Sequence, residues 1–402
     1  MGNVRNSIPR IDLQTALVGA FILATIFSIE FPVLQSISEY ASINSSDLAL
    51  LLLFIYFSYV VYSKGELRVP LPRVTLLVAL ASLWIVVTLA VATIRSPEPV
   101  TPSVLWLFKW FAGVAAFVIL QNLIDRNTAK ASIHLILIAG LILAIYSVTQ
   151  SIAGAYRIRV FFGNPNTLAA FFTLVATLSL AKSINRRSLI YLIPVIFSGG
   201  AVISTGSRSG LLGLIVGLFS ISILMAREFQ SRDIVAISTM AVPSLLIFPK
   251  VLGESVVDRL TGWVTITSGG IALSDTVWAR SFRIRLQLIE KAFDLFSQQP
   301  IFGYGWFAVP SRVGYLDVYY TTLLVETGLI GFVLFLYVHL SFIRSWLTDR
   351  TNGVFVIGSA CAAWYCGLLA QSIAGAFPRT PQILLLTFVL LISSKALTGP
   401  DQ

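Results

Sequence analysis

Arginine is the residue type whose number and placement most clearly point to chemistry in this sequence. The segments that we assign below to the outer side of a membrane hold ten arginines, whereas their lysines are only Lys250 and Lys291. Arginine offers a planar, bidentate set of N–H donors that fits phosphate, whereas lysine is a point charge. This preference favours a phosphate-bearing ligand over the alternative, contact with anionic head groups. The ten arginines are Arg95, Arg157, Arg159, Arg208, Arg259, Arg280, Arg283, Arg285, Arg312 and Arg379.

Residues that bind metals or act as nucleophiles are sparse. No Asp-x-Asp pair occurs, so the usual carboxylate clamp for a divalent cation is missing. Cys361 and Cys366 lie in one apolar run, which indicates neither a disulfide framework nor a zinc site. His134 lies near the inner end of a predicted span, and His339 lies ~33 Å beyond Asp317 along a straight helix. We interpret both histidines as structural, and we expect a reaction with no metal and no cofactor.

The remaining chemistry consists of outer arginines and a few outer carboxylates. A reaction outside the cytoplasm must use a substrate that is already activated, because ATP is absent there. A lipid-linked diphosphate sugar is such a substrate, and arginines can stabilise the charge of its departing diphosphate without a metal. The carboxylates that could assist are Glu290, Asp294, Asp317 and Glu326.

The composition shows where this chemistry must take place. Of the 402 residues, 56% are hydrophobic and 11% are charged, and the mean hydropathy is +0.86. A soluble domain carries roughly 25% charged residues, so a soluble enzyme, a disordered chain and a fibre are excluded. A membrane helix needs about 20 apolar residues. We therefore predict an all-α, polytopic membrane protein in which residues 1–402 form a single integral membrane domain.

Twelve apolar runs are long enough to cross a bilayer if tilt and short ends are allowed. The run at 188–205 contains Gly199 and Gly200, which suggests a broken or re-entrant helix. Gly213 and Gly217 form a GxxxG pattern, which indicates helix packing. The predicted spans are 12–30, 47–63, 72–94, 103–123, 132–152, 167–183, 188–205, 210–226, 233–251, 317–342, 353–373 and 380–395.

Lysine and arginine predict the orientation, because loops on the cytoplasmic side are enriched in both. With the N-terminus inside, the first outer loop, 31–46, contains neither residue type, whereas the inner loops contain them repeatedly. We therefore expect both termini in the cytoplasm. The basic residues of the inner loops are Lys64, Arg68, Arg73, Arg126, Lys130, Lys182, Arg186, Arg187, Arg227, Arg232, Arg344 and Arg350.

One outer loop, 252–316, is much longer than the others. Within it, residues 275–298 have the pattern of a helix that ends before Pro300. Apolar side chains recur on one face of this helix at spacings of three and four residues, which predicts an amphipathic helix on the outer leaflet. These side chains are Leu286, Ile289, Phe293 and Phe296.

Four segments of the sequence stand in a recognisable order and spacing. They are VFFGNPN at 160–166, STGSRSG at 204–210, PIFGYG at 300–305, which begins fifteen residues after Arg285, and ETGLIG at 326–331. Together they resemble motifs of the O-antigen ligase/polymerase family, which contains Wzy-type O-antigen polymerases and WaaL-type O-antigen ligases. The resemblance covers about 150–340.

This resemblance implies a GT-C-like membrane glycosyltransferase in the bacterial cytoplasmic (inner) membrane, with its active site facing the periplasm. Its substrates would be an undecaprenyl-diphosphate-linked glycan donor and a glycan acceptor. A chain-length regulator is an expected protein partner, and nucleic acid is not. The ligases commonly carry a catalytic histidine before the Glu-x-Gly motif. Counted back from Glu326, that position is Asp317 here, which favours the polymerase over the ligase.

The resemblance also implies roles for particular residues. Arg208 and Arg285 would hold the donor diphosphate, and Asp317 would accept the proton of the attacking hydroxyl or orient that hydroxyl. The alternative for Asp317 is an N-cap of the span that follows it. The expected catalytic residues are thus Asp317, Arg208 and Arg285. The expected substrate-binding residues are Arg157, Arg159, Arg280, Arg283, Asn166, Tyr319 and Glu326.

Several of these residues have a structural alternative. Asn164 and Asn166 flank Pro165 and are more typical of a turn and a helix cap than of catalysis. Tyr319 could stack on a sugar or belong to an interfacial aromatic belt. Glu326 is an intramembrane carboxylate, which indicates either function or pairing with a buried group.

A second buried charge is Lys109, which lies between Trp106 and Trp110. It could contact either Glu326 or a lipid diphosphate.

A different class of protein, a transporter of anionic lipid-linked sugars, would also need arginines on its outer side. Such transporters place matching broken helices in two related halves. No such internal symmetry is visible in this sequence, and the large asymmetric outer loop favours an enzyme.

The orientation can be tested with single cysteines introduced at Ser274 and Asn185. Because the inner loops are rich in lysine and arginine, we expect position 274 outside and position 185 inside. In intact cells an impermeant thiol reagent should label position 274 alone. Labelling of position 185 but not of position 274 would contradict the orientation.

Overall fold

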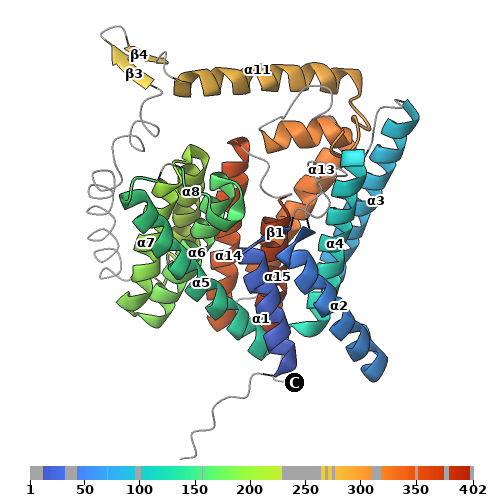
Figure 1. Cartoon of the computed structure of the whole chain (residues 1–402), viewed down its shortest axis with the longest axis vertical. Coiled ribbons are helices and arrows are strands. Elements are labelled where there is room, and N and C mark those ends of the chain that lie inside the picture. Colours follow the sequence, from blue (N-terminus) through green and yellow to red (C-terminus); the bar gives the residue numbers. More distant parts are fainter. Residues whose placement is uncertain are drawn as a thin grey trace, which may run out of the picture.

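The structure is a computed structural model that consists almost entirely of helices (Figure 1). It describes residues 12–31, 43–69, 71–95, 101–155, 157–228, 264–267, 270–273, 277–308, 318–348, 352–374 and 380–398. Within these ranges, helices coincide with eleven of the twelve predicted spans, and the other span, 233–251, lies outside them. Six of the eleven are long and apolar enough to cross a membrane, and five are shorter. The predicted all-α, polytopic membrane class is therefore confirmed.

The apolar helices begin and end close to the predicted boundaries, where polar side chains cap them. Asp12 accepts a hydrogen bond from the backbone N–H of Thr15 at 2.6 Å, and Asp125 accepts one from Thr128 at 2.8 Å. The helices are α1 (Leu13–Ile26), α2 (Ser45–Lys64), α3 (Pro72–Arg95), α4 (Thr101–Leu123), α5 (Arg126–Ile152), α6 (Pro165–Arg186), α7 (Leu192–Ser204), α8 (Arg208–Leu224), α13 (Tyr319–Leu347), α14 (Asn352–Gln371) and α15 (Pro381–Ala396).

Helix α6 forms the centre of one half of the bundle. It packs against α5, α7, α8 and α14, and nearly all of its side chains are buried. On the same side, Gly213 and Gly217 of α8 face α14, where Gly367 approaches the backbone of α8. The expectation that the GxxxG pattern serves helix packing is confirmed, because small residues let two backbones come close.

The glycine pair in α7 does not break the helix. Helix α7 continues through Gly199 and Gly200, and the 3-10 turn Leu189–Tyr191 precedes it. The expectation of a break there is wrong, although α7 is short: thirteen residues span about 20 Å. The interruption lies in α13 instead, at Gly328, whose φ of 66° and ψ of −174° are not helical.

A loop from the outer segment replaces the backbone hydrogen bonds that α13 loses at this break. The N–H groups of Tyr304 and Gly305 donate to the carbonyl oxygens of Val325 and Glu326, both at 2.9 Å. Beyond the break, the N–H of Leu329 donates to the carbonyl of Pro300 at 2.8 Å. Helix α3 contributes as well, because the Trp84 indole N–H donates to the Thr327 carbonyl at 2.9 Å. A broken helix is tolerated inside a membrane protein when its freed backbone groups are satisfied in this way.

The long helix α11 (Val277–Gln298) lies across one end of the bundle, as Figure 1 shows. It confirms the helix predicted at 275–298. Ala292 is buried against Tyr304 and Val325, so α11 rests on the loop and on the first half of α13. Leu286 and Phe293 remain exposed, as an amphipathic helix on a membrane surface requires.

In the described part of the chain, the strands form two short antiparallel hairpins. In the first, β1 (Glu30–Phe31) pairs with β2 (Ile43–Asn44), next to the start of α2. In the second, β3 (Val264–Thr267) pairs with β4 (Gly270–Leu273), with Val264 opposite Leu273, shortly before α11.

Gly328→Ala should destabilise the protein more than Gly65→Ala. Both glycines have a positive φ. Gly65 is in the left-handed helical region, which costs an alanine roughly 1–2 kcal/mol. Gly328, with ψ at −174°, is in a region that essentially only glycine adopts. A Cβ at Gly65 meets open space, whereas a Cβ at Gly328 would overlap the carbonyl of Ile301. We expect the thermal midpoint of purified Gly328→Ala protein in detergent to fall further than that of Gly65→Ala. Equal midpoints would show that the break does not depend on close packing.

Candidate active site

The segment Asn164–Pro165–Asn166 begins helix α6. Asn164 is the N-cap, and its side-chain oxygen accepts a hydrogen bond from the backbone N–H of Asn166 at 2.8 Å. Pro165 occupies the first turn, where a missing N–H costs little. The interpretation of Asn164 as a helix cap is therefore confirmed. Because Asn164 caps the helix, the side chain of Asn166 is not needed as a cap and can make other contacts.

Ser207 and Arg208 begin helix α8 beside this turn. Ser207 is the N-cap of α8, and its hydroxyl oxygen accepts from the N–H of Gly210 at 2.9 Å. The same hydroxyl donates to the side-chain oxygen of Asn166 at 2.6 Å. This bond joins two segments that lie 41 residues apart in sequence. Arg208, the first residue of α8, is half-buried at this junction.

The end of α14 connects the junction to α13. The side-chain amide of Gln371 donates to the backbone carbonyl of Asn166 at 2.7 Å. Two residues earlier, the Leu369 carbonyl accepts from the Tyr320 hydroxyl at 2.7 Å. The last turn of α14 therefore holds the start of α6 and the first turn of α13 close to each other.

A buried hydrogen-bonded triad holds the first half of α13. The hydroxyl of Tyr319 lies 2.9 Å from Nε2 of His339, and Nδ1 of His339 lies 2.7 Å from the hydroxyl of Tyr365. The estimate that His339 lies ~33 Å from the outer mouth assumed a straight helix. That assumption is wrong, because the break at Gly328 folds the first half of α13 toward the second.

This triad changes the expected role of Tyr319. Its side chain is only 2% exposed, so its ring does not offer a face for a sugar in this structure. We interpret Tyr319 as a residue that positions the start of α13. Sequence reasoning missed this role because no local signal links a tyrosine to a histidine twenty residues later.

Asp317 lies outside the described residues, but the start of α13 bears on its alternative role. The N-cap of α13 is Val318, and the carbonyl of Val318 accepts from the N–H of Thr322 at 3.0 Å. Asp317 therefore precedes the cap position. The N-cap interpretation of Asp317 does not match the observed start of the helix.

Glu326 lies at the break of α13 and is completely buried. Its backbone carbonyl accepts from Gly305, so its position depends on the contact between α13 and the loop. The expected burial of this carboxylate is confirmed, while its contact with substrate stays a prediction.

The predicted arginines lie on several different elements. Arg285 is half-buried on α11, and Arg283, two residues before it on the same helix, is exposed. Arg280 belongs to α11 as well, but its side chain lies outside the described residues. Arg157 and Arg159 are exposed in the segment that leads to the 3-10 turn Val160–Phe162.

This segment also lies close to α15. The side chain of Gln382 in α15 donates to the Phe161 carbonyl at 3.3 Å. The start of α15 therefore lies at the same end of the bundle as the start of α6, which is the end predicted to face outward.

Within the described ranges, no group of three or more His, Cys, Asp or Glu residues could hold a metal ion. The site consists instead of the joined starts of α6 and α8, the last turn of α14 and the first half of α13. Arg208 lies at the junction, and α11 with Arg285 crosses the same end of the bundle (Figure 1). Such an arrangement suits the binding of an anion rather than of a metal.

Comparison with known proteins shows a similarity to one family over part of the chain. The model of the O-antigen ligase family matches residues 193–336, about a third of the chain. The match begins in α7, ends in α13 and includes the segments at 204–210, 300–305 and 326–331. No curated protein sequence matches the chain.

Over residues 193–336 the chain is similar to the O-antigen ligase family, whose members are membrane glycosyltransferase-like enzymes. The apolar helices and this match indicate a multi-pass protein of a bacterial inner membrane. This similarity indicates lipid-linked glycans as substrates and a function of the ligase or polymerase type.

Ser207 and Gln371 are two positioning residues that the sequence analysis did not single out. Ser207 could have been found, because serine before a helical run is a common N-cap. Gln371 could not, because nothing in its neighbourhood in sequence shows that the end of α14 meets the start of α6.

Ser207→Ala should reduce glycan synthesis more than Ser222→Ala on the same helix. Ser207 caps α8 and holds Asn166, so its loss should shift Arg208; a cap is worth about 1 kcal/mol. Ser222 only donates to the Leu218 carbonyl within the helix. We expect roughly a tenfold loss for Ser207→Ala, which corresponds to about 1.4 kcal/mol. Wild-type glycan levels in the Ser207→Ala strain would show that the junction does not position the reaction.

Proposed function

We propose that this protein polymerises undecaprenyl-diphosphate-linked oligosaccharide repeat units on the outer face of the cytoplasmic membrane. The observation that carries the proposal is the junction of α6 and α8, where two helix N-termini meet beside Arg208. Each N-terminus carries a partial positive charge of roughly half an elementary charge. Helix N-termini with an arginine bind phosphate groups well, and a diphosphate is the charged part of the proposed donor.

The donor diphosphate would lie between this junction and α11. In the proposal, Arg208 holds it from the bundle and Arg285 holds it from α11. Arg280, Arg283, Arg157 and Arg159 would contribute positive potential around it, and the exposure of the last three suits this role. The positive charge on both sides makes a metal ion unnecessary for binding, and we propose that the reaction is metal-independent.

The reaction would break a glycosyl phosphate bond and form a glycosidic bond. A hydroxyl oxygen of the acceptor glycan attacks the anomeric carbon of the donor sugar, and the bond between that carbon and the diphosphate oxygen breaks. The electron pair leaves with undecaprenyl diphosphate, whose charge Arg208 and Arg285 stabilise. The proton of the hydroxyl passes to the carboxylate of Asp317. Because an aspartate is a weak base at neutral pH, the transfer accompanies bond formation and does not precede it.

An O-antigen ligase, which transfers glycan from undecaprenyl diphosphate to a lipid or other acceptor, is the second candidate. The family match supports both functions equally. We favour the polymerase because Asp317 stands where the resembled ligases carry a histidine. The products of a strain that lacks the gene distinguish the two. Loss of a polymerase leaves single lipid-linked repeat units, whereas loss of a ligase leaves long lipid-linked chains.

The transporter alternative is weaker. Transporters of the alternating-access type place broken helices in corresponding positions of two halves. Among the described helices, α13 is interrupted at Gly328, but α7, which the sequence analysis expected to be broken, is continuous. A chain-length regulator as partner remains part of the polymerase proposal.

Replacement of Arg208 or Arg285 by alanine should remove most activity while the protein still inserts. Loss of a donor to developing charge typically costs ~100- to 1000-fold in rate. Lysine should restore little activity, because an ammonium group lacks the bidentate fork. Arg186→Ala, at the exposed end of α6 far from Asn166, is the control and should behave as wild type. If both lysine variants made near-normal glycan chains, positive charge alone would suffice, and the two arginines would attract the diphosphate without bidentate binding.

Asp317→Asn tests the proposed proton acceptor. Asparagine keeps the size and polarity of aspartate but cannot accept the proton as a base, so we expect a loss of polymerisation at normal protein level. Glycan chain length in a complemented deletion strain measures the effect. Asp294→Asn on the exposed face of α11 is the matched control. Polymerisation by Asp317→Asn at the wild-type rate would place the chemistry elsewhere.

A further inference from the structure

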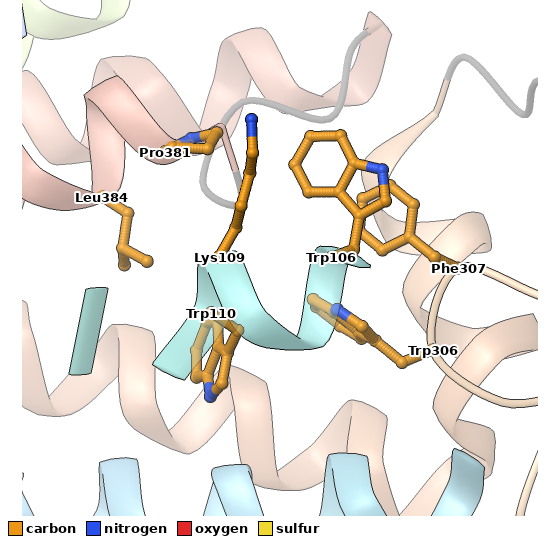
Figure 2. A pocket seen from close by; sticks show the side chains of 7 residues that line it. All are labelled: Trp106, Lys109, Trp110, Trp306, Phe307, Pro381 and Leu384. Atoms are coloured by element: carbon orange, nitrogen blue, oxygen red, sulfur yellow. The ribbon is translucent and has the colours of Figure 1, made fainter. Parts of the chain in front are cut away.

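Two lysines of the described helices place their ammonium groups over aromatic rings. Lys109 of α4 lies 5.7 Å from the centre of the Trp106 ring, and further aromatic side chains lie beside it (Figure 2). Lys182 of α6 lies 5.9 Å from the centre of the Tyr191 ring, in the 3-10 turn between α6 and α7. A contact of this kind is weak, so the surroundings decide what else each lysine can bind.

The surroundings of Lys182 are positively charged. Lys182 and Arg186 of α6 both lie within electrostatic range of His134 on α5. Lys130 lies four residues before His134, so the two share one exposed face of α5. In the part of the chain that the structure describes, no carboxylate forms an ion pair with any of these residues. We call Lys130, His134 and Lys182 the basic cluster; Arg186, exposed at the end of α6, lies beside it.

Lys182 is half-buried on the helix that the rest of this half of the bundle encloses. A long lysine stem can lie along apolar surface while its ammonium group reaches the outside. Because Lys182 lies near both His134 and Tyr191, its ammonium group emerges between α5 and the 3-10 turn. A partly buried cation without an anionic partner is costly inside a membrane protein. An anion from outside the chain would therefore stabilise this arrangement.

The ring of His134 has a defined orientation. Its Nδ1 lies 2.8 Å from the carbonyl oxygen of Lys130. Because a carbonyl only accepts hydrogen bonds, Nδ1 carries the hydrogen, and Nε2 of the neutral ring is an acceptor. The side chain is exposed, so Nε2 can accept from a hydroxyl group outside the protein. The basic cluster therefore offers two ammonium donors for a phosphate and one acceptor for a hydroxyl.

An exposed apolar surface begins directly beside the basic cluster. Ile138 and Ile142 continue the exposed face of α5 at intervals of four residues, and both are more than half exposed. Ile193 near the start of α7 is exposed, as are Leu189 and Ile190 of the 3-10 turn. Helix α5 packs against α7, so these side chains belong to one side of the bundle. In a membrane they contact acyl chains, and the basic cluster then lies at the level of the head groups.

The basic cluster lies far from the candidate active site. Helix α6 begins at the junction with α8, and Lys182 lies ~24 Å from Asn166 along this helix at 1.5 Å per residue. The end of the bundle with the cluster is the end predicted to face the cytoplasm. A ligand of the cluster would thus not touch the junction beside Arg208.

We propose that the basic cluster binds an anionic phospholipid of the phosphatidylglycerol type. Lys182 and Lys130 donate to the phosphate, Nε2 of His134 accepts from a hydroxyl of the head group, and an acyl chain lies along Ile138 and Ile142. Basic pockets between membrane helices on the cytoplasmic side bind anionic head groups in this way. Phosphatidylethanolamine is disfavoured, because the two lysines repel its ammonium group. The proposal does not depend on the proposed polymerase function.

The test is native mass spectrometry of the purified protein in detergent, with phosphatidylglycerol, phosphatidylethanolamine and inorganic phosphate as probes. We expect phosphatidylglycerol to bind more tightly than phosphatidylethanolamine. Lys182→Met should weaken phosphatidylglycerol about tenfold, because it removes a charge-assisted hydrogen bond. Lys182→Arg should retain most of the binding, and His134→Phe should cost less than Lys182→Met, because it removes a neutral hydrogen bond. Lys64→Met is the control, since this lysine is exposed at the end of α2, on the same predicted side of the membrane.

Three outcomes would overturn the proposal. Equal affinity for the two lipids would show that the cluster does not select a negative charge. A loss in folded Lys182→Met no larger than that in Lys64→Met would show unspecific attraction. Displacement of phosphatidylglycerol by inorganic phosphate would indicate a site for a free anion instead. The thermal midpoint of each variant shows whether it is folded. If Lys182→Met does not fold, the exposed Lys130→Met takes its place, with the same expected loss of phosphatidylglycerol binding.

Discussion

The contact between the break of α13 and the loop from Pro300 to Gly305 is the interaction on which the rest of the site depends. A helix inside a membrane cannot leave backbone groups without partners, because lipid offers none. The break at Gly328 frees several such groups, and the loop and Trp84 bind them. Because the loop follows α11, the same contact places α11 against the first half of α13.

A second group of contacts depends on this geometry. The fold in α13 brings Tyr319 to His339 and Tyr320 to the last turn of α14. The same turn of α14 binds Asn166, and Asn166 binds Ser207. The starts of α6 and α8 thus meet beside Arg208, and their combined positive potential explains why arginine without a metal suits this site. The same loop continues into Trp306 and Phe307, whose rings pack against Trp110 and Trp106 of α4.

The sequence by itself determined the class of this protein, nearly all of its described helices and the residue types of the site. Long apolar runs predict membrane helices because burying each run in lipid depends on composition and length alone. The amphipathic helix α11 was predicted at 275–298 and observed at Val277–Gln298, because its spacing of apolar residues is a local property. The four segments that resemble the family also depend on local order, and the family match at residues 193–336 includes three of them, whereas the segment at 160–166 lies outside it.

Only the tertiary structure decided which helix is broken and which residues meet. The sequence predicts a break at Gly199–Gly200 and none at Gly328. In the structure α7 is a continuous helix, whereas α13 is interrupted and its backbone groups bind a loop that passes beside it. The pairing of Asn166 with Ser207, the role of Gln371 and the approach of His339 to Tyr319 likewise join residues far apart in the chain. Contacts of this kind depend on how helices pack against each other, and the pattern within any single helix does not contain that information.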